Sequence, residues 1–188
     1  MYEVAIIGAG PAGASAALFT AKAGKKTIVI DNEKSMTNRA WVENHYGVKE
    51  IEGPALLELG KNQAKEQGAE LVTKTVTNIA KVSDHFTITT DDNNVIETKH
   101  VLLATGALTD LADKIGVNLI SGTEPRIKSI VDVNSDGKTN IDGIWAAGTI
   151  AGVSVHTIIT AGHGASVAIN IISELNGERY VDHDILKS

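Results

Sequence analysis

The run GAGPAG near the start of the sequence is the most specific chemical signal in the chain. Gly8 permits a tight turn, Gly10 has no side chain and lets a phosphate approach the backbone, and Gly13 allows close helix packing. Pro11 and Ala12 fall in the first turn of the helix expected to follow, where the missing proline N–H costs nothing. The free N–H groups and the positive dipole end of that helix would then attract phosphates.

A carboxylate follows these glycines at a spacing that suits a nucleotide. Asp31, with Asn32 beside it, comes about twenty residues later, where it can accept hydrogen bonds from a ribose diol. The elements that must position these groups occur in the required order: an apolar strand over residues 2–7, a helix over 14–23 and a second buried strand over 27–30. We therefore predict a dinucleotide-binding strand–helix–strand unit; the alternative is a glycine-rich turn that binds nothing.

Composition limits the other possibilities. The chain has 188 residues, of which 43% are hydrophobic, so we expect one globular domain with a real core. The net charge of −6 and the lack of a dense Lys/Arg cluster argue against a nucleic-acid partner. The sequence contains no cysteine, which excludes disulfide, thiolate and iron–sulfur chemistry, and no metal site is expected. The apolar stretch 143–172 is broken by glycines and histidines and makes a poor membrane span, so we expect a cytoplasmic protein.

The remaining chain reads as a mixed α/β fold. We expect a helix from Gly53 to about Gln67, and then an antiparallel meander of three runs, 70–79, 86–90 and 95–98. Residues 100–104 predict a buried strand and residues 109–115 a short helix. Further strands over 127–133 and 144–147 precede a helix over 157–175 with a broad apolar face. The fold class is thus α/β with a central parallel sheet, helices and an antiparallel meander.

Two more glycine corners lie at the ends of buried strands. Thr105 and Gly106 follow one strand, and Gly148 follows another. Because the carboxyl ends of parallel strands meet in one crevice, these corners and the first turn could line a single extended ligand. The helix that begins near Thr157 would add a second positive N-terminus to that crevice.

Three other features have both a functional and a purely structural interpretation. The polar segment 32–44 is long for a connection, and the rings of Trp41 and Tyr46 either cover a ligand or fill the loop's own small core. His156 either donates a proton or hydrogen bond near a ligand, or caps the helix start, which we favour. His163 is expected to contribute to helix packing.

Taken together, these segments resemble the thioredoxin reductases, a family of two-dinucleotide-binding flavoproteins. GAGPAG looks like their opening motif, and VENHYG (42–47) is similar to their VEN-x-P-G segment. LATGA (103–107) resembles their second signature. Segments 53–57, 63–64, 139–148 and 160–164 match their later motifs in the same order. The resemblance covers nearly the whole chain and implies a Rossmann-like FAD-binding domain.

The resemblance also implies roles for individual residues. Gly8, Gly10, Pro11, Ala12 and Gly13 would hold the FAD pyrophosphate. Asp31 would bind the adenosine ribose, and the backbone near Val76 would meet the adenine. Asn44 would contact the flavin side, and Thr105 and Gly106 would pack against the cofactor. These implied contacts are Asp31, Asn32, Asn44, Val76, Thr105, Gly106, Gly148, Thr149, His156 and Thr157.

Members of this family carry an NADPH domain with a Cys-x-x-Cys pair, and this sequence contains neither. The chain looks like one FAD domain over residues 1–188, its two segments, about 1–107 and 108–188, joined directly near residues 107–109. Thr149 stands where the family has an aspartate that holds the ribitol chain, which predicts either weaker FAD binding or a different ligand. Val155 and His156 replace a usual arginine–glutamine pair.

We therefore expect an FAD-dependent oxidoreductase or electron carrier without disulfide chemistry, with His156 as the only, weak, catalytic candidate. Electrons would come from a redox partner protein or from NAD(P)H stacking on an exposed flavin, and the uncovered flavin face would be open or buried in a homodimer. The alternatives are a non-catalytic nucleotide-binding module or partner-dependent subunit, and a simple NAD-dependent dehydrogenase. The VEN-type loop argues against the dehydrogenase, because binding NAD does not require such a loop.

Overall fold

The computed structural model describes residues 1–182 and 184–186 of the chain. Its centre is a seven-stranded sheet in which β5 (Glu70–Thr73), β2 (Thr27–Asp31), β1 (Tyr2–Ile7) and β8 (Val95–Leu103) are neighbours in that order and parallel. β11 (Ile144–Ala146) pairs in parallel with β8. The fold is α/β with a central parallel sheet, as the sequence predicts.

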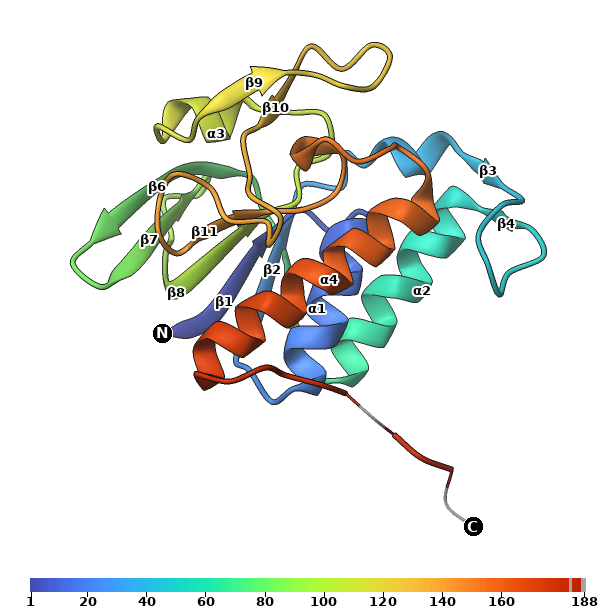
Figure 1. Ribbon diagram of the computed structural model, residues 1–188, viewed down its shortest axis with the longest axis horizontal. Helices are drawn as coiled ribbons and strands as arrows, with labels where there is room; N and C mark the ends of the chain where they lie inside the picture. The colour runs from blue at the N-terminus through green and yellow to red at the C-terminus, as the bar shows by residue number, and fades with distance from the viewer. Residues whose placement is uncertain (183, 187–188) are drawn as a thin grey trace.

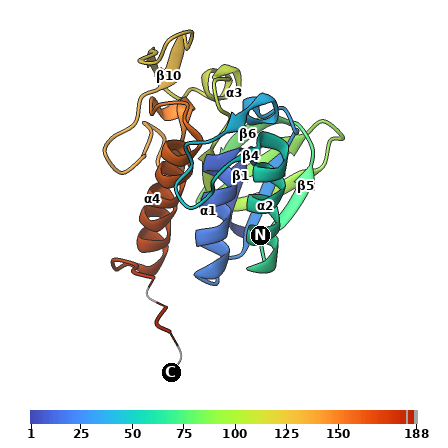
Figure 2. The same ribbon diagram turned by 90° about the vertical axis from the view of Figure 1, so that its right-hand side faces the viewer.

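Helices cover one face of this sheet. Helix α1 (Pro11–Lys22) lies between α2 (Gly53–Glu66) and α4 (Thr157–Asn176), and the three run side by side (Figures 1 and 2). α4 is long and apolar enough to cross a membrane by length and composition alone. In the structure, however, α4 packs against α1 as part of the core.

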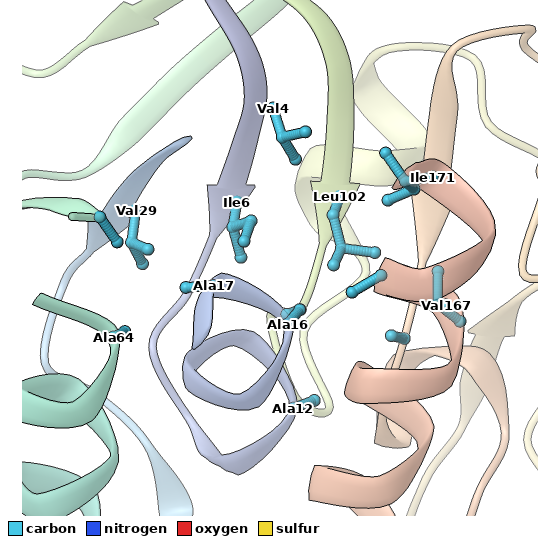
Figure 3. Packing of buried hydrophobic residues seen from close by; sticks show 14 of the residues in the cluster. Val4, Ile6, Ala12, Ala16, Ala17, Val29, Ala64, Leu102, Val167 and Ile171 are labelled. Carbon is cyan, nitrogen blue, oxygen red and sulfur yellow. The ribbon is translucent and has the colours of Figure 1, made fainter. Parts of the chain in front are cut away.

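Strand alternation divides the core into two layers. Val4, Ile6, Val29 and Leu102 point toward the helices (Figure 3). There they meet the small side chains Ala12, Ala16 and Ala17 of α1, Ala64 of α2, and Val167 and Ile171 of α4. Their sequence neighbours, among them Ala5, Ile7, Ile30 and Leu103, point to the opposite face and form a second buried cluster. Both faces of β2 and of the second half of β1 are buried, which explains the continuous apolar runs there.

Strand β8 belongs to two kinds of pairing. One edge pairs with β1 along its length, while the other pairs with antiparallel β7 (His85–Thr90) over residues 95–98 and with parallel β11 over residues 101–103. The separate strands expected over 95–98 and 100–104 are therefore one strand. β6 (Val76–Val82) pairs with β7 and completes the meander.

The prediction of a single meander strand over residues 70–79 is wrong. β5 follows helix α2 and returns parallel to β2, as a strand–helix–strand crossover requires. The strand ends before Lys74, whose backbone N–H donates to the carbonyl of Asp31 at 3.0 Å. A separate strand, β6, begins after this interruption.

The remaining elements lie outside the central sheet. The expected strand over 127–133 is the shorter β10 (Ser129–Val131), which pairs with β9 (Leu119–Ser121), a strand the sequence analysis did not predict. α3 (Asp110–Lys114) forms where a short helix was expected. The long segment after β2 contains a helical turn, η1 (Met36–Arg39), and β3 (Trp41–Val42), which pairs with β4 (Ile51–Glu52). A second turn, η2 (Thr149–Ala151), follows β11.

Candidate functional site

A cleft of about 660 Å³ lies at the carboxyl ends of the parallel strands. Its walls come from the glycine turn after β1, the end of β2, the segment between β5 and β6, the turn after β8 and the corner after β11. In open parallel sheets this edge is where ligands bind. Twelve of the residues singled out from the sequence line it: Gly8, Gly10, Pro11, Ala12, Asp31, Asn32, Val76, Thr105, Gly106, Gly148, Thr149 and Thr157.

The first wall is the turn between β1 and α1. Gly8 has φ +99°, and a Cβ there would lie 2.6 Å from the carbonyl oxygen of Ala104. A Cβ on Gly13 would lie 1.8 Å from the carbonyl oxygen of Gly8, so Gly13 is buried behind the turn and closes the helix onto the strand. Both positions therefore require glycine.

The start of helix α1 is open toward the cleft. Gly10 is the N-cap and provides no side-chain hydrogen bond, and Pro11 follows it as the first helical residue. A Cβ at Gly10 would meet only the hydroxyl of Ser35, at 3.3 Å. The backbone N–H groups of the first turn thus keep their donor capacity for a ligand, in a place where a helix dipole favours negative charge.

The three glycine corners are in direct contact. The first touches the end of β8 through Gly8 and Ala104, and the third touches the first through Gly148 and Ala12. Gly148 has φ +85°, and a Cβ on it would lie 2.8 Å from the Cβ of Ala12. In the second corner, the hydroxyl of Thr105 donates to the carbonyl of Leu108 at 2.6 Å, which fixes that turn beside the cleft. One ligand can therefore contact all three corners.

The carboxylate of Asp31 stands at the end of β2 and is 7% exposed. Its Oδ1 accepts a hydrogen bond from the backbone N–H of Ala9 at 3.1 Å, and its Oδ2 lies 2.6 Å from Nζ of Lys61. Lys61 comes from α2 and was not recognised from the sequence. The expected ribose acceptor is in the cleft wall, but it is already held by a turn N–H and by a cation.

The start of helix α4 closes another side. Thr157 lines the cleft, and its hydroxyl lies 3.0 Å from Nδ1 of His45 in the VENHYG segment. Asn44, the residue of that segment expected to touch the ligand, is exposed and lies outside the lining. His156 is also exposed, outside the lining, and its Nδ1 lies 2.8 Å from the hydroxyl of Ser154. The loop thus meets the helix start through His45.

Two partly buried histidines act as acceptors. Nδ1 of His163 accepts from the backbone N–H of Gly148 at 3.1 Å, and Nδ1 of His100 accepts from the indole Nε1–H of Trp145 at 3.1 Å. Burial lowers the pKa of both histidines below the ordinary value of 6.5. His163, expected only to pack, therefore supports one of the glycine corners in its neutral form.

The rings of the long loop do neither of the things expected of them. Trp41 is 59% and Tyr46 93% exposed, and neither lines the cleft nor fills a core. The loop contributes smaller side chains instead, from Met36, Thr37 and Ala40. Helical turn η1, capped by the hydroxyl of Ser35, turns these residues toward the cleft.

Other lining residues had no recognisable sequence signal. They are Lys74, Thr75 and Thr77 around β6, and Asp110, Leu111 and Lys114 of α3. Val155, which stands in place of a family arginine, and Thr160, in the family-like segment 160–164, also line the cleft. Lys114 and Thr77 come together through a contact between distant segments, in which the Nζ of Lys114 donates to the carbonyl of Thr77 at 2.8 Å. Among the described residues no group of three or more His, Cys, Asp or Glu side chains could hold a metal ion.

The cleft matches a dinucleotide in its donors and in its space. The first turn of α1 offers N–H donors, Gly10 at its start has no side chain, and the carboxylate of Asp31 stands beside the same turn, where it accepts from the N–H of Ala9. These are the groups that diphosphates and riboses require.

Comparison with known proteins identifies relatives with these features. Residues 2–127 match the family described as "Pyridine nucleotide-disulphide oxidoreductase". The chain is 36% identical to a thioredoxin reductase of Peptoclostridium acidaminophilum over 126 residues, which are 65% of this chain and 40% of that protein. It is 39% identical to a thioredoxin reductase of Aquifex aeolicus over 114 residues, 57% of this chain and 35% of that protein. The chain thus spans well under half the length of these curated relatives.

Solved structures agree on the fold. A thioredoxin reductase from Gloeobacter violaceus superimposes with a TM-score of 0.81 at 17% identity, over 99% of this chain and 98% of that one. An oxidoreductase from Agrobacterium tumefaciens gives 0.82 at 14% identity, over 94% and 99%. The fold is therefore the Rossmann-like FAD-binding domain fold of thioredoxin reductases.

Proposed function

We propose that this chain, which belongs to the pyridine nucleotide-disulphide oxidoreductase family, binds FAD and works as a flavoprotein oxidoreductase or electron carrier. The observation that carries the proposal is the convergence of three glycine corners on one cleft of about 660 Å³ that has a carboxylate at one end. A protein that binds only a nucleotide, without a second large group such as a flavin, would not need the corners after β8 and β11.

Each part of the cofactor has a matching part of the cleft in this proposal. The N–H groups that follow Gly10 would hold the pyrophosphate, and Asp31 would accept from the adenosine ribose, with the adenine near Val76. Thr105, Gly148 and the start of α4 would contact the flavin half. FAD, when bound, supplies hydride and single-electron transfer, while the protein supplies orientation and charge.

The protein's own groups restrict the chemistry. The sequence has no cysteine, so disulfide exchange by this chain is excluded. The start of α4 would stabilise negative charge on a ligand beside Thr157 through the helix dipole. Because His156 is exposed and bonded to Ser154, proton transfer would fall to water or to a substrate.

We further infer that the two family segments, about 1–107 and 108–188, form one domain joined directly near residues 107–109. The turn that holds Thr105 and Leu108 leads straight into α3, which also lines the cleft. Electrons would then come from NAD(P)H or from a redox partner protein. The flavin side of the cleft would be either open to solvent or covered by a second copy of the chain.

A second candidate is a non-catalytic FAD-binding module or a subunit that depends on a partner. One observation favours it over an independent enzyme. Thr149 offers a neutral hydroxyl in the cleft wall where the family has an aspartate. The loss of a charge-assisted hydrogen bond would lower the affinity for FAD.

The decisive experiment is to purify the protein, extract any bound flavin and identify it by chromatography, adding FAD if the protein is colourless. We expect FAD at up to one equivalent per chain. Gly10→Val should abolish binding and leave the fold intact, because a Cβ there would approach only the hydroxyl of Ser35, at 3.3 Å, a side-chain atom that can move. Gly162→Val serves as the matched control, since Gly162 meets nothing within 4 Å. A protein that takes up no FAD would refute the proposal.

Anaerobic titration with NADH and NADPH then separates the two candidates. Bleaching of the flavin spectrum without any added protein supports the oxidoreductase. A stable yellow protein that neither cofactor bleaches supports the module. Light scattering in the same buffer shows whether a second copy is present.

A further inference from the structure

The ion pair between Asp31 and Lys61 joins two elements at the ribose end of the cleft. Lys61 lies in α2 and Asp31 at the end of β2, thirty positions earlier in the chain. The pair is well shielded, because the side chains are 10% and 22% exposed for Asp31 and Lys61. A charge pair in such a place is held more firmly than one on the open surface.

Small residues allow this pair to form. A Cβ on Gly60 would lie 3.4 Å from the Cβ of Ala14, so α2 approaches α1 closely just before Lys61. Ala64, one turn later, is fully buried against the same core. The backbone of α2 is thereby fixed, and the lysine chain is directed across the end of β2.

The carboxylate still has capacity for a ligand. An ionised carboxylate offers about four acceptor positions. In Asp31, one on Oδ1 is taken by the N–H of Ala9 and one on Oδ2 by Lys61. Each oxygen therefore retains an acceptor position, and Asp31 lines the cleft whereas Lys61 does not.

We propose that Lys61 is a positioning residue that holds the carboxylate of Asp31 oriented to accept both hydroxyls of an adenosine ribose, so that the cleft selects ligands with an intact 2′,3′-diol. This inference rests on the proposed function, because it assigns the end of the cleft that FAD would occupy with its adenosine. Without Lys61 the shielded carboxylate would lose the counter-ion that holds its Oδ2, and it would be free to turn away from the diol. The diol would then face a weaker and less well oriented acceptor.

The test compares ADP with 2′,3′-dideoxy-ADP as competitors of FAD, in the wild type, Lys61→Met and Lys61→Arg. Charge-assisted hydrogen bonds predict that the wild type prefers ADP by roughly tenfold or more. Lys61→Met should reduce this preference to within about threefold, while Lys61→Arg, which retains the charge, should preserve it. Lys65→Met is the matched control one turn along α2, at an exposed position, and should leave the preference unchanged.

The outcomes separate this inference from the proposed function. A wild type that binds neither FAD nor ADP refutes the proposed function itself. If the wild type binds ADP and 2′,3′-dideoxy-ADP equally, or if Lys61→Met keeps the full preference for ADP, only the role of Lys61 is overturned. Equal weakening of ADP and dideoxy-ADP also overturns it, since a merely structural residue would act on both. If Lys61→Met does not fold, Lys61→Gln replaces it, with the same expected loss.

Discussion

The Nδ1 atom of His163 lies 3.1 Å from the backbone nitrogen of Gly148 and accepts its hydrogen bond. The histidine is on α4, and the glycine is the corner after β11 that lines the cleft. Burial lowers the pKa of His163, so the ring is neutral near pH 7 and has a free lone pair for this bond. A side chain from the last helix thus supports the backbone that a ligand would contact.

Replacing His163 with leucine should destabilise the protein. The N–H of Gly148 would lose its acceptor in a partly buried place, which costs about 1–3 kcal/mol. His163→Gln offers a carbonyl oxygen as substitute acceptor and should recover much of that loss. Urea unfolding followed by circular dichroism measures both free energies. Equal stability of the leucine and glutamine variants would show that the hydrogen bond contributes nothing.

The two partly buried histidines also predict how stability depends on pH. His100 and His163 have pKa values lowered from 6.5 by burial, so the unfolded chain binds protons that the folded chain resists. Their contribution is therefore complete above pH 6.5 and is lost as the pH falls through the lowered folded pKa values. Each group adds a slope of at most about 1.4 kcal/mol per pH unit.

Unfolding free energies measured between pH 7.5 and pH 5 check this sign. The wild type should lose stability on acidification below about pH 6.5. His163→Gln, which has no titrating ring, should lose less over the same interval. A pH profile that is identical in the two proteins would remove His163 from the explanation.

The contact between α1 and α4 gives a prediction with an internal control. A Cβ on Gly164 would lie 2.0 Å from the carbonyl oxygen of Ala12, whereas Gly162, two residues earlier in the same helix, meets nothing within 4 Å. Gly164→Ala must push the helices apart and should cost about 1–3 kcal/mol or more. Gly162→Ala should instead stabilise the helix by about 0.5–1 kcal/mol. Thermal unfolding of the two variants should shift in opposite directions.

The GAGPAG turn, its flanking strands and Asp31 were predictable because their order and spacing are local. Each residue there has a requirement set within about thirty positions, such as the positive φ of Gly8. The same holds for the start of α2 at Gly53 and the end of α4 near Gly177. These signals do not depend on knowing what packs against them.

The features that were missed depend on contacts between distant segments. The β-rich run 70–79 has one composition throughout, yet only its first part can reach β2, because helix α2 delivers it there in parallel. The pairing of Lys61 with Asp31 and of His45 with Thr157 could not be inferred from spacing either. Aromatic rings in a long loop were expected to cover a ligand or to fill a small core. Trp41 and Tyr46 do neither, because both are exposed on the segment that contains the short β3–β4 pair.

Thr149 provides the last prediction, because it departs from the family pattern inside the cleft. Thr149 is 9% exposed, follows Gly148 and lines the wall near the start of α4. In Thr149→Asp, a carboxylate would stand in this nearly buried place without a partner when no ligand is bound, and should lower the stability of the free protein. Bound FAD would give it ribitol hydroxyls as donors, and a charge-assisted bond is worth about 1.5–3 kcal/mol against about 1 for a neutral one.

The variant should therefore melt at a lower temperature than the wild type without FAD and show a larger increase in melting temperature when FAD is added. Calorimetric titration should give FAD affinity several-fold higher than that of the wild type. Thr149→Asn, which is similar in size but uncharged, is the control and should bring the smaller gain of a neutral bond. If the aspartate variant binds FAD more weakly than the wild type, the ribitol does not lie against Thr149, and the flavin half of the proposed site must be placed elsewhere in the cleft.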